Sequence, residues 1–343
     1  ACKMAYVKNK RAMVAPDVLE EVGQAFDELC PAPVPEMDDE IPEDISTYLK
    51  AIAPRLDGSG HKGGAGRICV LGGSIDYAGA PYYAGMAALR VGAELLYLNT
   101  ALEATGPIKS YSPELMVSDI YRWSHISSDN NDCVAQEKER MHEKVKGLLP
   151  RLHAMTIGPG LGRDDRVLDG VKMIIRTCGE AKLPLVIDAD GLWLIERAPE
   201  ILEGYTNAVL TPNVAELRRL SKALTGKEDT DPQEICNKLK GPIVLQKGAI
   251  DRIFSPDKPP LECAETGAPR RPGGLGDFLS GSLGVFLGWA RESGKDNRYA
   301  CKAACTVVRR ACKMAYVKNK RAMVAPDVLE EVGQAFDELC PAP

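Results

Sequence analysis

One carboxylate in this sequence is set apart by its neighbours. Asp277 follows Gly273, Gly274 and Gly276 in the stretch RPGGLGDFLSG, and an apolar segment typical of a buried helix comes directly after it. Glycines allow several backbone N–H groups to point at one place, and a helix that begins at Asp277 adds unpaired N–H groups and the positive end of its dipole. The stretch therefore predicts an anion hole suited to a phosphoryl group.

A carboxylate in such a hole would repel a phosphate unless it took part in the reaction. Beside a bound γ-phosphate, Asp277 could take the proton from an attacking hydroxyl, which makes it the candidate general base. Arg270 and Arg271, just upstream, could offset the charge of a nucleotide. The alternative is that Asp277 only caps the helix, although the flanking glycines exceed what a cap requires.

Other polar residues follow short apolar segments in the same way. The turn GPGLG at 158–162 satisfies part of a dinucleotide-binding pattern, and a tight turn between a strand and a helix explains it equally well. Asp188 and Asp190 in DADG could contact a metal ion or a substrate hydroxyl, and Asp190 could instead cap the next helix. Asn213 and Glu216 could contact a substrate or form a capping box. Each stretch has a chemical and a structural interpretation.

The elements that must position these residues alternate along the chain. Strands are expected at 67–71, 95–98, 114–117, 154–157, 185–187, 208–210 and 243–245. Helices are expected at 81–92, 134–149, from 165 onward, and at 214–224. This alternation predicts an α/β fold with a central, mostly parallel sheet and helices on both faces. The polar turns follow the carboxyl ends of the strands, where open α/β sheets bind their ligands.

The bulk properties exclude several classes of protein. The chain has 343 residues and a net charge of −5, so we expect neither a nucleic acid nor an anionic membrane as its main partner. No apolar run reaches the ~18 residues of a membrane span, and no P-loop motif occurs. The 11 cysteines show no zinc-binding spacing, which predicts free thiols in a reducing compartment. We expect a cytoplasmic protein, with a mitochondrial isoform as the alternative.

The two ends of the chain carry the same sequence. Residues 1–33 recur without a change at 311–343. The pattern at 297–318 predicts one continuous helix, and the second copy begins inside it, so the first copy starts with half a helix. We interpret residues 1–33 as an artefactual duplicate, with a segment swapped between subunits as the alternative. Residues 34–42 are interpreted as a linker, and 43–343 as the catalytic domain.

The motifs taken together resemble a known family. HKGGAGRICVLGGS, IGPGLGRDD, VIDADGL, LTPNVAEL, QKGAID and GGLGDFLSG, in this order, resemble the ATP-dependent NAD(P)H-hydrate dehydratases of the ribokinase-like superfamily. The resemblance covers about residues 43–335 and implies a ribokinase-like fold. It implies a lyase that repairs nicotinamide cofactors: ATP phosphorylates the hydroxyl of (S)-NADHX or NADPHX, and elimination of phosphate restores NADH or NADPH. The implied cofactors are ATP and Mg²⁺, and we expect a homo-oligomer.

The resemblance also implies roles for residues at matching positions, with Asp277 as the base that activates the hydroxyl of the hydrate. The implied nucleotide contacts are Lys247, Gly248, Ala249, Ile250, Asp251, Gly267, Ala268, Pro269, Arg270, Arg271, Pro272, Gly273, Gly274, Leu275 and Gly276. The implied hydrate contacts are Gly160, Gly162, Asn213, Val214, Ala215, Glu216, Leu217, Arg218, Arg219 and Asp277. Leu275 stands where the family often has glutamine, but an anion hole uses backbone N–H groups. No residue is assigned as a metal ligand.

Two other functions remain open from the residues. A ribokinase-like small-molecule kinase acting on a vitamin precursor or a sugar would share Asp277 and the anion hole. Its product would be a stable phosphate ester instead of an eliminated phosphate. A catalytically dead binding protein is the second alternative, and the intact Asp277 in GGLGD argues against it.

Overall fold

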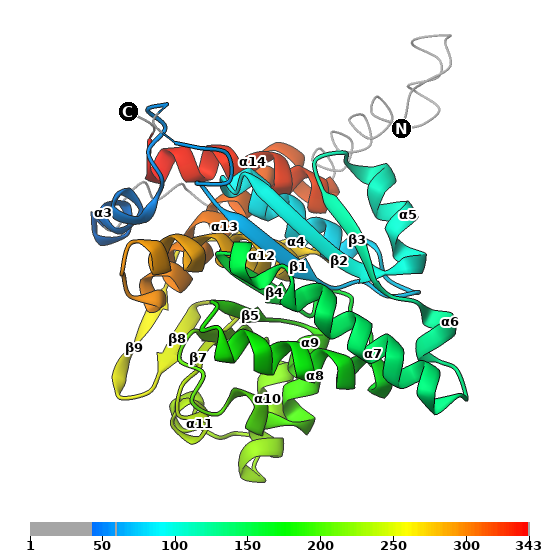
Figure 1. Ribbon diagram of the computed structural model, residues 1–343. Coiled ribbons are helices and arrows are strands. Elements are labelled where there is room, and N and C mark those ends of the chain that lie inside the picture. The colour runs from blue at the N-terminus through cyan, green and yellow to red at the C-terminus, as the bar shows by residue number, and fades with distance from the viewer. Residues whose placement is uncertain (1–42, 59, 342–343) are drawn as a thin grey trace, which may run out of the picture.

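The computed structural model describes residues 43–58 and 60–341, and a sheet forms its centre. The strands of the sheet are β1 (Arg67–Leu71), β2 (Leu95–Ala101), β3 (Met116–Tyr121), β4 (Ala154–Ile157), β5 (Leu185–Ile187), β6 (Ala208–Leu210), β7 (Ile243–Gln246), β8 (Asp251–Ser255) and β9 (Lys258–Cys263). Within the described residues they form one nine-stranded sheet in the order β3-β2-β1-β4-β5-β6-β7-β8-β9 (Figure 1).

Most of the sheet is parallel, as the alternation of strands and helices predicts. Every pair from β3 to β7 is parallel, and β8 and β9 add an antiparallel hairpin at one edge. The direction of winding changes between β1 and β4, which are adjacent in the sheet but not in sequence. The carboxyl ends of these two strands therefore border the crevice where doubly wound sheets bind ligands.

Helices cover both faces of the sheet. They are α3 (Glu43–Ile52), α4 (Gly79–Val91), α5 (Leu102–Tyr111), α6 (Trp123–Ile126), α7 (Asn131–Lys146), α8 (Asp165–Glu180), α9 (Asp190–Arg197), α10 (Val214–Thr225), α11 (Pro232–Leu239), α12 (Leu275–Glu292), α13 (Asn297–Asn319) and α14 (Ala325–Leu339). Figure 1 shows α7, α8 and α9 along one face, while α12 packs with α4 and α13 on the other. The predicted fold class is confirmed.

The strands separate two hydrophobic cores because successive side chains point to opposite faces. In β1, Ile68 and Val70 belong to the core under α4 and α12, whereas Cys69 and Leu71 belong to the core under α8. All four side chains are buried. Burial on both faces explains why the central strands read as short, continuous apolar runs.

Some predicted boundaries shift, and several elements were missed. The third strand runs over Met116–Tyr121 instead of 114–117, and the helix predicted at 134–149 is α7, which begins earlier because Asn130 caps it. The hairpin of β8 and β9 was not predicted, nor were α3, α5 and α11. The KPPLEC sequence of β9 carries a lysine, a glutamate and two prolines, which suit an edge strand but are unusual in a strand.

The C-terminal copy of the repeat packs on the body of the domain. α13 runs through the copy boundary at Ala311 as one helix, as predicted. In α14, Val328 and Val332 are fully buried, and Phe336 packs against the rings of other core residues. The identical residues 1–33 and the linker 34–42 lie outside the described residues. Their interpretation, and the domain boundaries based on it, stay predictions.

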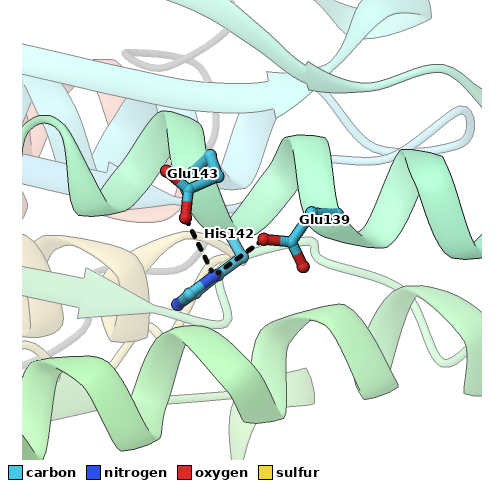
Figure 2. A group of neighbouring side chains, drawn as sticks. All are labelled: Glu139, His142 and Glu143. Carbon is cyan, nitrogen blue, oxygen red and sulfur yellow. Dashed lines mark ion pairs between the residues drawn. The ribbon is translucent and has the colours of Figure 1, made fainter.

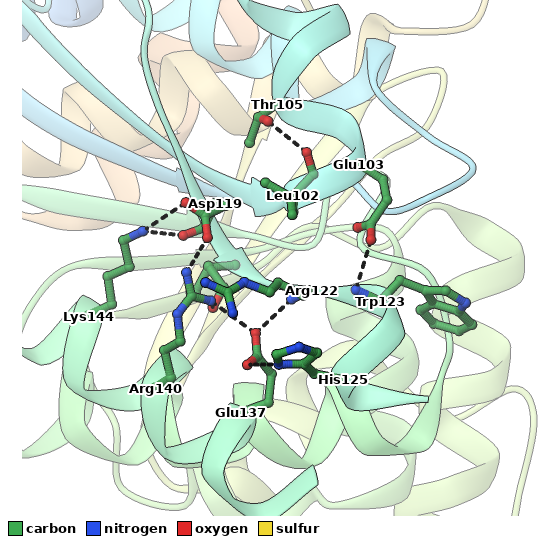
Figure 3. A network of polar contacts seen from close by, with 11 residues as sticks. Leu102, Glu103, Thr105, Asp119, Arg122, Trp123, His125, Glu137, Arg140 and Lys144 are labelled. Carbon is green, nitrogen blue, oxygen red and sulfur yellow. Dashed lines mark hydrogen bonds and ion pairs between the residues drawn. The ribbon is translucent and has the colours of Figure 1, made fainter. Parts of the chain in front are cut away.

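A polar network ties the end of β3 to α6 and α7 (Figure 3). Glu137 of α7 is only 3% exposed. Its carboxylate accepts hydrogen bonds from the backbone N–H of Arg122 at 2.7 Å and from Arg140 Nη1 at 3.0 Å, and it lies 3.2 Å from Nδ1 of His125. Arg140 also pairs with Asp119 of β3. Every charge buried here has a partner, so the network holds the edge of the sheet together.

The helices and the cysteines bear on two predictions from the sequence, the absence of a membrane span and the presence of free thiols. Among the helices formed by residues 43–58 and 60–341, none combines the length and the apolar character that a membrane span needs. The nine cysteines of the same residues are free thiols, as predicted, and most of them are buried.

Candidate functional site

The turns that follow β5 and β7 meet the start of α12. A Cβ atom placed on Gly276 would lie 3.6 Å from Lys247 Nζ and 3.8 Å from Asp188 Oδ2. Asp188 follows β5, Lys247 follows β7, and Gly276 lies in the first turn of α12. Glycine at 276 thus leaves an open space with an ammonium and a carboxylate at its border.

Asp188, which is buried, and Lys247, which is partly buried, form an ion pair at this place. Asp188 Oδ1 accepts a hydrogen bond from Lys247 Nζ at 2.8 Å and another from Thr211 Oγ1 at 2.8 Å. Lys247 Nζ also lies 3.9 Å from a carboxylate oxygen of Glu216. Burial lowers the pKa of Lys247, but the attraction of Asp188 and Glu216 outweighs it, and the pKa is raised. The lysine therefore carries its charge at neutral pH.

Asp277 lies beside this pair and holds its proton unusually tightly. Burial raises the pKa of its carboxyl to about 8, the negative charge of Asp188 adds to the rise, and Lys247 opposes it. Without a ligand, the carboxyl is therefore mostly protonated at neutral pH. A base with a pKa near the working pH is suited to proton transfer.

The start of α12 differs from the predicted one, and the difference decides the role of Asp277. The helix begins at Leu275, not at Asp277, and Gly274 is its N-cap residue with φ 99°. Asp277 is thus the third residue of the helix and not its cap, so the capping alternative is wrong. The first helical hydrogen bond runs from Phe278 N to Gly274 O. The N–H groups of Leu275, Gly276 and Asp277 consequently have no acceptor within the helix, as an anion site requires.

A cavity of about 860 Å³ opens in front of this helix start. Several of the predicted nucleotide contacts line it: Lys247, Gly248, Ala249, Asp251, Gly267, Ala268, Pro269, Arg271, Pro272, Leu275 and Gly276. Three of the predicted hydrate contacts line the same cavity: Asn213, Val214 and Ala215. A volume of this size suits a nucleotide or a similar small molecule.

Other predicted contacts lie outside the lining of the cavity. From the nucleotide set these are Ile250, Arg270, Gly273 and Gly274. From the hydrate set they are Gly160, Gly162, Glu216, Leu217, Arg218, Arg219 and Asp277. Arg270 donates from Nε to Met323 O at 2.7 Å, which ties the glycine-rich loop to the segment before α14. Leu217 is buried in the core under α8. Their roles in binding stay predictions.

One wall of the cavity comes from α13, a predicted helix that the sequence interpretation did not assign to the site. Arg309 of α13 holds both carboxylate oxygens of Asp251, at 2.6 and 2.7 Å, and donates to the carbonyl oxygens of Gly248 and Ala249. Asp251 Oδ1 also accepts from Gly248 N at 2.9 Å. The carboxylate of Asp251 thus shapes the KGAID turn. Other lining residues missed by the sequence interpretation are Ala264, Glu265, Thr266, Leu279, Cys305, Val308 and Cys312.

The GPGLG turn after β4 is a tight turn in the crevice between β1 and β4. A Cβ on Gly158 would overlap the carbonyl oxygen of Asp188, and Gly160 has φ 62° and faces Tyr77. Gly162 donates from its N–H to Asp190 Oδ2 at 3.0 Å. The tight-turn interpretation is therefore correct for the geometry. Tyr77, 57% exposed, leaves an aromatic ring open to solvent at the mouth of the crevice.

Two structural alternatives from the sequence are also decided. Asn213 and Glu216 form the capping box of α10: Asn213 Oδ1 accepts from Glu216 N at 3.0 Å, and Glu216 Oε2 accepts from Asn213 N at 2.7 Å. Asp190 does not cap α9, because the N-cap residue is Ala189. Asp190 instead binds the GPGLG turn and pairs with Arg163 Nε at 2.9 Å.

A metal site made wholly of protein ligands is absent from the lining of this cavity. Among the residues that the structure describes, only Glu139, His142 and Glu143 of α7 bring three such ligand atoms together (Figure 2). Nδ1 of His142 lies 3.7 Å from an oxygen of each carboxylate, and both glutamates are exposed. None of the three lines the cavity. A cation at the cavity would need ligands from phosphates and water.

Comparisons with known proteins point to the same family as the motifs that form this site. The family described as NAD(P)H-hydrate dehydratase matches residues 68–334. The chain belongs to this family. A curated relative from Rattus norvegicus, an ATP-dependent (S)-NAD(P)H-hydrate dehydratase, is 41% identical over 310 residues, which cover 87% of this chain and 86% of the relative.

Solved structures show the same fold at lower identity. A ribokinase-like superfamily protein from Enterococcus faecalis has a TM-score of 0.67 at 20% identity and covers 86% of this chain and 95% of its own. The ADP/ATP-dependent NAD(P)H-hydrate dehydratase from Bacillus subtilis, co-crystallised with ATP and Mg²⁺, has a TM-score of 0.62 at 22% identity and covers 85% of this chain and 97% of its own. The predicted ribokinase-like fold is confirmed.

Proposed function

We propose that this enzyme dehydrates (S)-NADHX and (S)-NADPHX to NADH and NADPH and consumes ATP in doing so. The observation that carries the proposal is Asp277, a carboxyl with a pKa raised to about 8 that adjoins the unpaired N–H groups at the start of α12. The cavity beside it supports an ATP site. Membership of the NAD(P)H-hydrate dehydratase family supports the choice of substrate.

The reaction begins with transfer of the γ-phosphoryl group. In the proposed complex ATP would occupy the cavity with its phosphates toward Leu275, Gly276 and Lys247, which line it. Asp277 takes the proton of the hydrate's hydroxyl, whose oxygen forms a bond to the γ-phosphorus while the bond to ADP breaks. The N–H groups of the helix start and the ammonium of Lys247 stabilise the negative charge of the transferred group.

The second stage removes the phosphate again. The C–O bond of the phosphate ester breaks, and inorganic phosphate leaves with the bonding electrons. A proton leaves the neighbouring carbon, and its electron pair restores the double bond of the dihydronicotinamide ring. The net change is hydrate plus ATP to NAD(P)H, ADP and phosphate.

Mg²⁺ is proposed to enter with the nucleotide. The lining of the cavity lacks a three-ligand protein cluster, and Mg²⁺ suits such a place because it keeps several waters and binds substrate phosphates. When bound, it would neutralise charge on the phosphates during transfer.

The rival activity is that of a small-molecule kinase, and one assay separates the two. The full chain is incubated with ATP, Mg²⁺ and (S)-NADHX, and absorbance in the NADH band is followed together with release of phosphate. A dehydratase restores the absorbance and releases phosphate in equal amount. A kinase consumes ATP, but the absorbance stays low and the phosphate remains in an ester.

Two further properties are proposed from the sequence alone. Free thiols and a balanced, slightly acidic surface support a cytoplasmic enzyme, with a mitochondrial isoform as the alternative. We also infer a homo-oligomer, which light scattering of the full chain would test.

A further inference from the structure

The backbone that carries Asp188 is held in a conformation that side chains rarely adopt. Ala189, the next residue, has φ 48° and ψ −117°. Neighbouring segments fix the turn: Asp188 N donates to Ile157 O at 3.0 Å, and Asp188 O accepts from Gly191 N at 2.9 Å. Glycine at 158 allows this close approach, because a Cβ there would overlap Asp188 O. Strain of this kind persists where the surroundings impose it, and it concentrates at functional sites.

The strained turn delivers the side chain of Asp188 to one place. The residue is 1% exposed, and Oδ1 is engaged by Lys247 and Thr211. Oδ2 lies toward Gly276, on the same side as Lys247 Nζ. The carboxylate thus holds the ammonium at the open face of the first turn of α12, where the cavity ends.

Asp277 and Lys247 interact with each other and with three further titratable groups. Asp188 from β5 raises the pKa of Asp277, and Lys247 from β7 lowers it. Tyr83 of α4 has its own pKa raised by burial and, in a smaller part, by Asp277. Lys247 is faced by Asp188 and by Glu216 of α10. Of these, Lys247 is the cation that favours the ionised form of Asp277.

We propose that Asp188 is a positioning residue for phosphoryl transfer: it holds the Lys247 ammonium at the open face of Gly276, where the phosphates of ATP would lie. The proposal rests on the phosphoryl transfer proposed above, and Asp188 touches no reacting atom. Before ATP binds, the ion pair keeps the long lysine side chain in one rotamer, so its charge is already in place when the γ-phosphate arrives. Preorganised charge of this kind is a main source of catalysis.

Stability alone does not explain this ion pair. The cost of removing two charges from water offsets most of their attraction, so a buried pair contributes little net stability compared with apolar residues. The strained turn at Ala189 adds a further cost. Both costs are explained if the position of the lysine matters for the reaction.

The test measures the ionisation of Asp277 directly in the full chain without nucleotide. The chain is labelled with ¹³C at the aspartate carboxyl carbons, and the signal that disappears in Asp277→Asn is assigned to Asp277. Its pKa is then measured by NMR in the wild type, in Asp188→Asn, in Lys247→Met and in the double variant. Asp169→Asn and Lys172→Met are the matched controls, because these residues form a half-buried ion pair of 3.0 Å on α8.

The double-mutant cycle separates the direct repulsion of Asp277 by Asp188 from the hold of Asp188 on Lys247. Lys247→Met raises the pKa of Asp277 by about one pH unit or more in the wild-type chain. In the Asp188→Asn background the same substitution raises this pKa clearly less, because the lysine is no longer held in position. Asp188→Asn also lowers kcat at least tenfold at every pH, because a free lysine side chain no longer starts in position. The controls change neither quantity.

Several results would overturn the proposal. A pKa of Asp277 that stays constant in Lys247→Met, or that Lys247→Met shifts equally with and without Asp188, contradicts it. So does an Asp188→Asn enzyme with unchanged kcat. If Asp188→Asn does not fold, Asp188→Glu takes its place in the cycle, because it keeps the negative charge and moves the carboxylate that holds the lysine. The titration needs neither ATP nor hydrate. If the wild-type chain does not turn over the hydrate but the variants show the expected pKa shifts of Asp277, the proposed function is refuted and this placement of charge is still supported.

Discussion

Glu137 and Asp277 are two carboxylates that the fold removes from water in different ways. Glu137 is 3% exposed and is surrounded by donors: the backbone N–H of Arg122, the guanidinium of Arg140 and the ring of His125 (Figure 3). Asp277 is partly buried, and no residue that the structure describes donates a hydrogen bond to its carboxyl. Its nearest charges, Asp188 and Lys247, have opposite effects.

The difference in hydrogen-bond donors gives the two carboxylates different roles: one holds the structure together, and the other can exchange a proton. A carboxylate with a full set of donors is stable as an anion and has nothing to offer to a ligand. A carboxylate without donors favours its protonated form and can exchange a proton with a bound group. The same residue type thus holds an edge of the sheet in one region and is prepared for proton transfer in the other.

The largest expected effect comes from removing the proton acceptor. Asp277→Asn should keep the fold and lower kcat for hydrate turnover by ~10²–10⁴-fold, the usual effect of losing a general base. The measurement is steady-state absorbance in the NADH band at saturating ATP. A variant that turns over hydrate at nearly the wild-type rate would show that another group takes the proton.

The same substitution should stabilise the protein, and the effect should depend on pH. In the folded chain the pKa of Asp277 is about 8, whereas an unfolded aspartate titrates near 4. Between these values the unfolded state loses its proton and the folded state keeps it, so wild-type stability falls as pH rises from about 4 to about 8 and then levels off. Asp277→Asn lacks this decline and should gain a few kcal/mol by pH 8. Urea unfolding at pH 5 and pH 8 measures it, and equal gains at both would contradict the assigned pKa.

Much of the fold follows from the sequence because the central strands are buried on both faces. Arg67–Leu71, Ala154–Ile157, Leu185–Ile187 and Ala208–Leu210 are short apolar runs that end in glycine or polar turns, and the structure places them as predicted. The edge hairpin escapes the same reasoning, because Lys258 and two prolines obscure the short apolar face that Leu261 and Cys263 form in β9. An edge strand is partly exposed to solvent, so the hydrophobic pattern in its sequence is weak.

The part of the candidate site that one local motif forms was predictable from the sequence, whereas the contacts between distant segments were not. Glycines beside Asp277 indicate a helix start that binds anions. The partnership of Asp188 with Lys247 spans 59 residues, and Arg309 contacts Asp251 across 58, so neither pair has a local signature. The first contact exists because the parallel strands β5 and β7 bring their carboxyl ends to one edge of the sheet, and the second because α13 packs against the edge strand β8.

Replacing Glu137 should have the opposite consequence and change stability without changing the reaction. Glu137→Leu removes the acceptor of two buried donors, Arg122 N and Arg140 Nη1, and should cost about 1–3 kcal/mol of stability. The kcat measured well below the melting temperature should stay at the wild-type value. Urea unfolding and the hydrate assay test the two statements. A variant with normal stability and reduced kcat would show instead that Glu137 takes part in the reaction.

The smallest expected effect distinguishes two neighbouring glycines at the helix start. Gly276→Ala should leave the melting temperature unchanged, because its Cβ would stay 3.6 Å from Lys247 Nζ, an ordinary contact. It should raise the KM for ATP about tenfold, because the methyl group enters the space that the phosphates need. Gly274→Ala should instead lower stability by about 1–3 kcal/mol, since Gly274 has φ 99° and a Cβ there would meet Ala325 and Tyr83 at 3.1 and 3.2 Å. Thermal unfolding and ATP titrations of both variants separate the effects. If Gly276→Ala binds ATP as the wild type does, the phosphates lie elsewhere, and Asp277 is not beside the group it is proposed to serve.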